Sequence, residues 1–123
     1  MKFTVGVDIE DNNRFENKID DVKFLKKIFT QGEIDYCLSK AFPKQHFAVR
    51  FCAKEAVIKA LCSFYEEKIT LGLTQIEVVK KSDVPFIKIH DTKYDDINFS
   101  LSLSHCKCHS MAQVLCFAKE NLS

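Results

Sequence analysis

Two carboxylates in this 123-residue chain stand in surroundings that favour chemistry. Glu55 lies in the segment RFCAKEAVIKAL, where most neighbours are apolar and an unpaired carboxylate would be costly to bury. Asp8 follows a Gly-Val pair in an alternating segment and supplies a second hard oxygen donor of the kind that Mg²⁺ prefers. The two can share a cation only if the fold brings them together. The simpler alternative is an ion pair of Glu55 with Lys59, one helical turn further on.

The segment HCKCH at residues 105–109 suggests zinc, because thiolates and imidazoles are good zinc ligands. In an extended strand, the cysteines would point to one face and the histidines to the other, so the four donors could not converge on one ion. A zinc-binding protein built on this segment is therefore a remote alternative. We expect Cys52, Cys62 and Cys116, which lie in apolar surroundings, to be small core residues.

Apolar periodicity predicts the elements that position these residues. Residues 3–10 alternate with a period of two, which predicts a strand with Asp8 on its more polar face. Helical spacing predicts a helix with a basic side over residues 20–29. Thr30, followed three residues later by Glu33, fits a capping box that opens a second short helix ending near Leu38.

The second half of the chain predicts one long helix followed by strands. Residues 44–64 are rich in alanine and contain no proline or glycine, so they should form the longest helix. Strands are expected over residues 73–80 and 86–90, separated by a turn, and again around residues 99–103 and 111–117. The sequence therefore predicts an α+β domain with a small, mainly antiparallel sheet and one long central helix.

Size and charge restrict the class of protein. A chain of 123 residues is near the usual size of one domain, and a net charge of +1 does not favour a nucleic-acid partner. No run of about 18 apolar residues is present, and the N-terminus has no apolar stretch long enough for export, so we expect no membrane partner. The six cysteines are typical of reduced thiols in a cytoplasmic protein.

Four blocks occur in order along the chain: GVDIEDNNRF at residues 6–15, FTQGEI at 29–34, RFCAKEAVIKAL at 50–61 and SLSH at 102–105. Together they resemble the holo-acyl carrier protein synthases, the small, single-domain branch of the 4'-phosphopantetheinyl transferase superfamily. The resemblance implies one such domain over residues 1–123, with the fold of that family. It also implies Mg²⁺-dependent transfer of 4'-phosphopantetheine from coenzyme A to a serine of apo-acyl carrier protein, in fatty acid biosynthesis, with adenosine 3',5'-bisphosphate released.

The resemblance makes Asp8 and Glu55 the ligands of Mg²⁺, with Mn²⁺ as a substitute, and adds Lys59 as a third catalytic residue. A cation that bridges the pyrophosphate oxygens stabilises the negative charge that develops there. Lys59 has two candidate roles, phosphate binding and the ion pair with Glu55. The base that takes the serine proton is left open among a water of the coordination shell, Glu55 and Asp8.

The resemblance also implies a set of coenzyme A contacts. Arg50 is expected near the nucleotide phosphates, because its planar fork suits them. His105 and Ser104 are expected near the 3'-phosphate or the adenine, although a histidine at a strand end is as often simply solvated. The full set is Arg50, Lys54, Lys59, Pro85, Ser104, His105 and Lys44.

A different basic group is implied to bind the acidic acyl carrier protein by complementary charge. Its members are Arg14, Lys18, Lys23 and Lys26. For each lysine the alternative is an ordinary solvated helix face. The resemblance further implies a homotrimer whose active sites lie between neighbouring subunits.

The chain departs from the family pattern at two places. Cys62 stands where a glycine usually follows KAL, and the next stretch lacks a glycine-rich loop. The turn that usually reads glycine, basic residue, proline appears as Asp83, Val84, Pro85, which removes one cation from the expected adenine side. Weaker coenzyme A binding is expected. The alternative function is a non-catalytic module of the same fold that binds carrier protein or coenzyme A, although the retained Asp8 and Glu55 argue against it.

Overall fold

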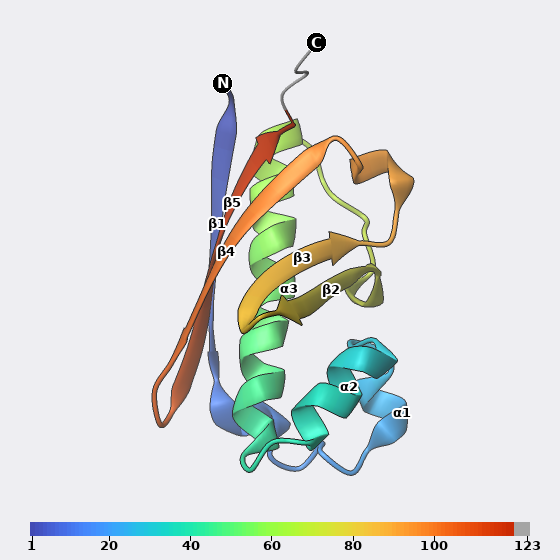
Figure 1. Cartoon of the computed structure of the whole chain (residues 1–123), viewed down its shortest axis with the longest axis vertical. Helices are drawn as coiled ribbons and strands as arrows, with labels where there is room; N and C mark the ends of the chain where they lie inside the picture. Colours follow the sequence, from blue (N-terminus) through green and yellow to red (C-terminus); the bar gives the residue numbers. More distant parts are fainter. Residues whose placement is uncertain (120–123) are drawn as a thin grey trace.

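The computed structural model describes residues 1–119. A long helix, α3 (Pro43–Tyr65), runs through the centre of the molecule, and two antiparallel sheets pack on it (Figure 1). The larger sheet has the order β1-β5-β4, and the smaller one is a hairpin of β2 and β3. These elements confirm the predicted α+β class, although the strands form two sheets instead of one. Their bounds are β1 Phe3–Asp11, β2 Ile76–Lys81, β3 Val84–Ile89, β4 Ile97–His105 and β5 His109–Ala118.

Two short helices, α1 (Val22–Leu25) and α2 (Gln31–Leu38), lie beside the N-terminal end of α3 (Figure 1). The predicted capping box is present at α2: the Thr30 hydroxyl accepts from the Glu33 N–H at 3.2 Å, and the Glu33 carboxylate accepts from the Thr30 N–H at 2.9 Å. The helix predicted over residues 20–29 is wrong in length, because only α1 is helical there. The backbone around it forms isolated turns, and its apolar side chains still reach the core.

The contact between β1 and α3 depends on Gly6. A Cβ atom at this position would lie 1.9 Å from the carbonyl oxygen of Ala56, so a side chain would push the strand away from the helix. The Thr4 hydroxyl donates to the carbonyl of Ala60 at 2.7 Å, one helical turn further along. The face of β1 that carries Thr4, Gly6 and Asp8 therefore packs against α3.

The opposite face of β1 is apolar and exposed. Phe3, Val5, Val7 and Ile9 have exposed fractions between 46% and 65%, and Met111 of β5, which pairs with Ile9, is 39% exposed. In an ordinary soluble sheet the apolar row of a strand faces the core and the polar row faces water. The arrangement is reversed here because the row of β1 that contains Gly6 packs closely against the alanine-rich surface of α3. We call these five residues the apolar sheet face.

The core has two parts. One lies between α3 and the sheets and includes Cys52 and Cys116, while Cys62 is half-buried at its edge, so the prediction of core cysteines is confirmed for the first two. The other part is aromatic and joins α1 and α2 to α3, with the Phe15 and Phe29 rings 5.7 Å apart. Within residues 1–119, no helix is both long enough and apolar enough to span a bilayer.

Candidate active site

Asp8 and Lys59 meet where β1 crosses α3. The Lys59 ammonium donates to the Asp8 carboxylate at 2.9 Å and to the carbonyl of Val7 at 3.0 Å. The Asp8 side chain is 17% exposed and the Lys59 side chain is 53% exposed. Among residues 1–119, the ion pair of Lys59 is with Asp8, and the pair with Glu55 that we considered from spacing does not form.

Glu55 lies beside this pair, half-buried on α3. Burial raises the pKa of the Glu55 carboxyl, and the negative charge of Asp8 raises it further, while Lys59 and Arg14 act in the opposite direction. The fold has therefore brought the two predicted carboxylates close enough to repel each other. This repulsion in a partly desolvated position is what a divalent cation would relieve.

The donor set is suited to a hard cation. Two carboxylates supply oxygen ligands of the kind that Mg²⁺ takes while keeping waters and substrate oxygens in its shell. In the described part of the chain, no three His, Cys, Asp or Glu side chains are grouped so that they could hold a metal ion. A cation at Asp8 and Glu55 would thus draw its remaining ligands from water or from a bound phosphate.

A cavity of about 370 Å³ collects a second set of predicted residues. Arg50, Pro85 and His105 all line it, together with Ser102 and Lys80. These side chains come from α3, β3, β4 and β2, so only the tertiary structure could bring them together. Lys80 and Ser102 were not predicted. Nothing in the immediate sequence of Lys80 distinguishes it from other strand residues, whereas Ser102 is the first residue of the SLSH block.

Arg50 is buried in this wall with only 2% of its surface exposed. Its guanidinium stacks on the Tyr36 ring at 4.2 Å and donates one bond, at 3.3 Å, to the carbonyl of His46. Its Nε atom has no hydrogen-bond partner, and no carboxylate pairs with it among the described residues. A buried cation without a counterion is costly, which indicates that an anion completes this site.

Two other predicted contacts lie elsewhere in the chain. Lys44 donates to the Asn13 side chain at 2.8 Å and lies 3.6 Å from Glu16, beside a different cavity of about 440 Å³. Ser104 lines a third cavity, between β4 and β5. Neither side chain lines the Arg50 cavity, although His105 lines both that cavity and the one beside Ser104.

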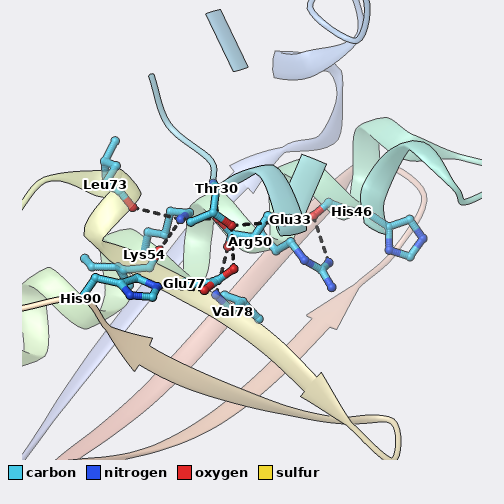
Figure 2. A network of polar contacts seen from close by, with 10 residues as sticks. Thr30, Glu33, His46, Arg50, Lys54, Leu73, Glu77, Val78 and His90 are labelled. Carbon is cyan, nitrogen blue, oxygen red and sulfur yellow. Dashed lines mark hydrogen bonds and ion pairs between the residues drawn. The ribbon is translucent and has the colours of Figure 1, made fainter. Parts of the chain in front are cut away.

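Lys54 contradicts the prediction that it contacts coenzyme A. Its side chain has no exposed surface, and its ammonium lies 2.7 Å from the Glu33 carboxylate (Figure 2). It also donates to the carbonyls of Leu73, at 3.0 Å, and Ile76. Burial lowers the pKa of Lys54, and the charge of Glu33 opposes this effect. Because every donor direction is used inside the protein, Lys54 joins α3 to α2 and β2 instead of reaching a phosphate.

The HCKCH segment is not the extended strand that we assumed in arguing against zinc. β4 ends at His105 and β5 begins at His109, so Cys106, Lys107 and Cys108 form the turn of a hairpin. The Asn12 side chain donates to the carbonyls of Cys106 at 2.9 Å and Lys107 at 3.1 Å, and it accepts from the hydroxyl of Ser110 at 2.6 Å. These bonds fix the turn against the end of β1.

The basic residues expected to bind a carrier protein lie in the turn after β1 and around α1. Lys23 and Lys26 are exposed, and the Lys18 ammonium lies 5.1 Å from the centroid of the Phe24 ring. Arg14 pairs with Glu10 at 3.1 Å and covers the Phe51 ring at 4.6 Å. Phe51 lies one helical turn before Glu55 on α3, so Arg14 lies next to the turn of α3 that carries Glu55.

Comparisons with known proteins identify the family of the chain. A family model described as the 4'-phosphopantetheinyl transferase superfamily matches residues 4–117. The chain is 35% identical to a holo-[acyl-carrier-protein] synthase of Geobacter sulfurreducens, covering 94% of this chain and 97% of the relative. It is 41% identical to the synthase of Thermodesulfovibrio yellowstonii, covering 90% and 95% of the two chains.

Solved structures show the same fold. A holo-(acyl-carrier-protein) synthase from Bacillus anthracis in complex with CoA (3',5'-ADP) superposes with a TM-score of 0.76 and 28% identity, covering 95% of this chain and 96% of that one. An ACPS-CoA complex named for Chronobacterium ammoniagenes reaches a TM-score of 0.82 at 21% identity, over 98% and 100% of the two chains. The chain therefore belongs to the holo-[acyl-carrier-protein] synthases of the 4'-phosphopantetheinyl transferase superfamily.

Proposed function

We propose that this transferase moves 4'-phosphopantetheine from coenzyme A to a serine of apo-acyl carrier protein, in a reaction that requires Mg²⁺ and serves fatty acid biosynthesis. The observation that carries the proposal is the cluster of Asp8, Glu55 and Lys59, in which the Lys59 ammonium lies 2.9 Å from the Asp8 carboxylate and the charge of Asp8 raises the pKa of the Glu55 carboxyl. The names of the relatives, and the complexes of related structures with CoA, support the choice of substrates.

Asp8 and Glu55 would hold the cation. When bound, Mg²⁺ would stabilise the negative charge that develops on the pyrophosphate of coenzyme A. Lys59 holds Asp8 in position through its hydrogen bond and keeps a half-exposed ammonium near the carboxylates, where a phosphate oxygen can reach it. On this proposal Lys59 has both roles considered for it, the ion pair and the phosphate contact, and its ion-pair partner is Asp8 instead of Glu55.

In the transfer, the serine oxygen forms a bond to the β-phosphorus of coenzyme A and the serine proton passes to a base. The bond from that phosphorus to the bridging oxygen breaks, so adenosine 3',5'-bisphosphate leaves. On this proposal the Arg50 cavity, with Pro85 and His105, holds the nucleotide end of coenzyme A. The unpaired Arg50 guanidinium supports a phosphate contact there.

We further propose that three copies assemble through the apolar sheet face, with active sites between neighbours. Five exposed apolar side chains lie together on one side of two adjacent strands and form a continuous apolar patch. Scattered apolar residues are normal on a protein surface, whereas a continuous patch is typical of an interface. An assembly would also let residues of one subunit complete the substrate site of the next, and on this proposal Lys44 and Ser104 contribute to the site of a neighbouring subunit.

The carrier protein would dock on the basic surface formed by Arg14, Lys18, Lys23 and Lys26. Three of these side chains are exposed, and Arg14 adjoins the carboxylate cluster, so an acidic helix placed here would bring its serine near Glu55. A cytoplasmic location is consistent with six cysteines that are all free thiols.

The test is the mass of an apo-acyl carrier protein after incubation with the enzyme, coenzyme A and Mg²⁺. We expect a gain of one phosphopantetheine group, lost when EDTA is added and lost in Glu55→Gln. Glu67→Gln, an exposed glutamate beyond the end of α3, is the matched control and should retain transfer. If coenzyme A binds but no carrier protein gains mass, the proposal is wrong and the non-catalytic binding module takes its place.

A further inference from the structure

Lys80 occupies an unusual position on β2. Along this strand, Ile76 and Val78 face the core, with exposed fractions of 0% and 5%. Because side chains on a strand alternate, Lys80 continues this core-facing row and Lys81 points to the opposite face. Lys80 also stands directly opposite Pro85 in the β2–β3 register. The row therefore ends on a cation that is directed toward the side of the hairpin occupied by α2 and α3.

Lys80 and two other positively charged side chains lie over the same aromatic ring. Three cationic groups lie over Tyr36: Arg50 at 4.2 Å, Lys40 at 4.6 Å and Lys80 at 5.5 Å from the ring centroid. Lys80 and Arg50 together line both the 370 Å³ cavity and a neighbouring cavity of about 240 Å³. Lys80 on β2 and Arg50 on α3 therefore line the same two cavities.

These charges are not neutralised by the protein. No ion pair joins Lys40, Arg50 or Lys80 to a carboxylate in the part of the chain that the structure describes. Glu77, the carboxylate beside the smaller cavity, is already bonded to Thr30 at 2.7 Å and lies 2.9 Å from His90 (Figure 2). Asp83 lines the larger cavity from an exposed turn, where water screens it.

His46, at the start of α3, reports the same excess of positive charge. Burial, as the largest cause, and the positive charges of Arg50, Lys40, Lys80 and His105 together lower the pKa of its imidazole to about 4. The ring is therefore neutral at pH 7 and adds no further positive charge to the cavity. Like charges held together with one buried guanidinium are unfavourable unless an anion completes the site.

We propose that Lys80 is a phosphate-binding residue that, with Arg50, selects ligands carrying a phosphomonoester on the nucleotide ribose. This inference rests on the proposed function, in which the Arg50 cavity holds the nucleotide end of coenzyme A. The turn Asp83-Val84-Pro85 lacks a basic residue, and Lys80, across the ladder from Pro85, supplies the missing charge. A doubly charged phosphomonoester fits two cations better than the singly charged diester oxygens of the pyrophosphate do.

The test compares coenzyme A with dephospho-coenzyme A, which lacks only the ribose phosphate, by titration calorimetry. Lys80→Met should weaken coenzyme A binding about ten- to hundredfold, as expected for losing a charged hydrogen bond, and should change dephospho-coenzyme A binding little. The matched control is Lys81→Met, which removes the same charge from the other face of β2 and should keep the wild-type preference. Lys80→Gln provides a second variant should Met not be tolerated.

The outcomes separate this inference from the function on which it rests. If Lys80→Met weakens both ligands equally, or keeps the wild-type preference, Lys80 does not select the ribose phosphate and the inference is overturned. If the wild-type chain binds neither ligand, the proposed function fails and takes this inference with it. A preference lost in Lys80→Met and kept in Lys81→Met supports both.

Discussion

At the scale of single residues, the most informative side chain is Glu55. It lies half-buried on α3 beside Asp8, and both burial and the neighbouring charge favour its protonated form. A carboxylate held in this way destabilises the fold in the absence of a cation, which is typical of groups retained for function. Lys59 offsets this repulsion only in part, because its hydrogen bonds are to Asp8 and Val7.

The first prediction concerns the pH dependence of stability. Because the folded-state pKa of Glu55 is raised, its carboxylate destabilises the fold once the pH passes through that pKa, and the penalty persists at neutral pH. In metal-free buffer, Glu55→Gln should therefore raise the free energy of unfolding at pH 7 by about 1 kcal/mol or less, since water screens the half-buried site. The gain should disappear at low pH, where wild-type Glu55 is protonated.

Urea titrations at several pH values measure this effect. The same variant should lose transfer about a hundredfold or more, because a cation ligand is removed. Destabilisation of the metal-free protein by Glu55→Gln would show that the carboxylate is instead a structural partner.

At the scale of elements, β1 and α3 position the site by direct backbone contact. The carbonyl of Ala56 lies where a Gly6 side chain would be, and Asp8 is two residues further along the strand. Any shift of β1 would therefore move Asp8 away from Glu55.

Gly6→Ala tests this contact. We expect it to lower the free energy of unfolding by about 3 kcal/mol, at the upper end for overpacking, since the clash is with backbone atoms. Transfer activity of the protein that remains folded should also fall. Gly32→Ala is the control, because its Cβ would lie 3.2 Å from the flexible Glu77 side chain. Equal stability of the two variants would contradict the role given to Gly6.

The buried pair of Lys54 and Glu33 connects α3 to α2 and β2. The Glu33 carboxylate accepts from Lys54, from the N–H of Val78 at 3.0 Å and from the N–H of Thr30 (Figure 2). One side chain thus bonds to three different segments, and Lys54 bonds to the loop before β2. The pair fixes the hairpin that carries Lys80 and Pro85 relative to Arg50.

Removing one partner leaves an uncompensated buried charge. Lys54→Met should cost about 3–5 kcal/mol of unfolding free energy. The double variant Lys54→Met with Glu33→Gln should recover part of this loss, because no buried charge then lacks its partner. Urea unfolding of both single variants and the double variant measures the coupling. Additive effects would show that the two side chains act independently.

At the scale of the whole molecule, the apolar sheet face is the surface through which we propose that copies associate. Its side chains project away from α3, so burying them requires another chain. The basic surface that we propose for the carrier protein lies around α1, which Figure 1 shows apart from the strands β1 and β5 of the apolar sheet face.

Val5→Glu should convert the proposed trimer to monomers, because it places a charge in the middle of the apolar sheet face. Light scattering coupled to gel filtration measures the mass of the particle in solution. Val84→Glu is the control: this valine is 52% exposed at the β2–β3 turn, away from the face, and its substitution should leave the mass unchanged. A wild-type monomer would overturn the trimer directly.

The sequence by itself determined the features that depend on a few neighbouring residues. The capping box at Thr30 and Glu33, the long helix without glycine or proline and the alternation of the strands were all readable, because caps and periodicities are local. The ordered motif blocks identified the family and named Asp8 and Glu55.

Only the tertiary structure decided which way these elements face. The polar row of β1 turned inward because Gly6 fits against α3, and Lys59 paired with Asp8 instead of Glu55 as a result. Lys54, next to Glu55 in sequence, became a core residue because α2 and β2 cover its side of α3. Burial and pairing depend on surfaces brought together from distant parts of the chain, and no local pattern in the sequence carries that information.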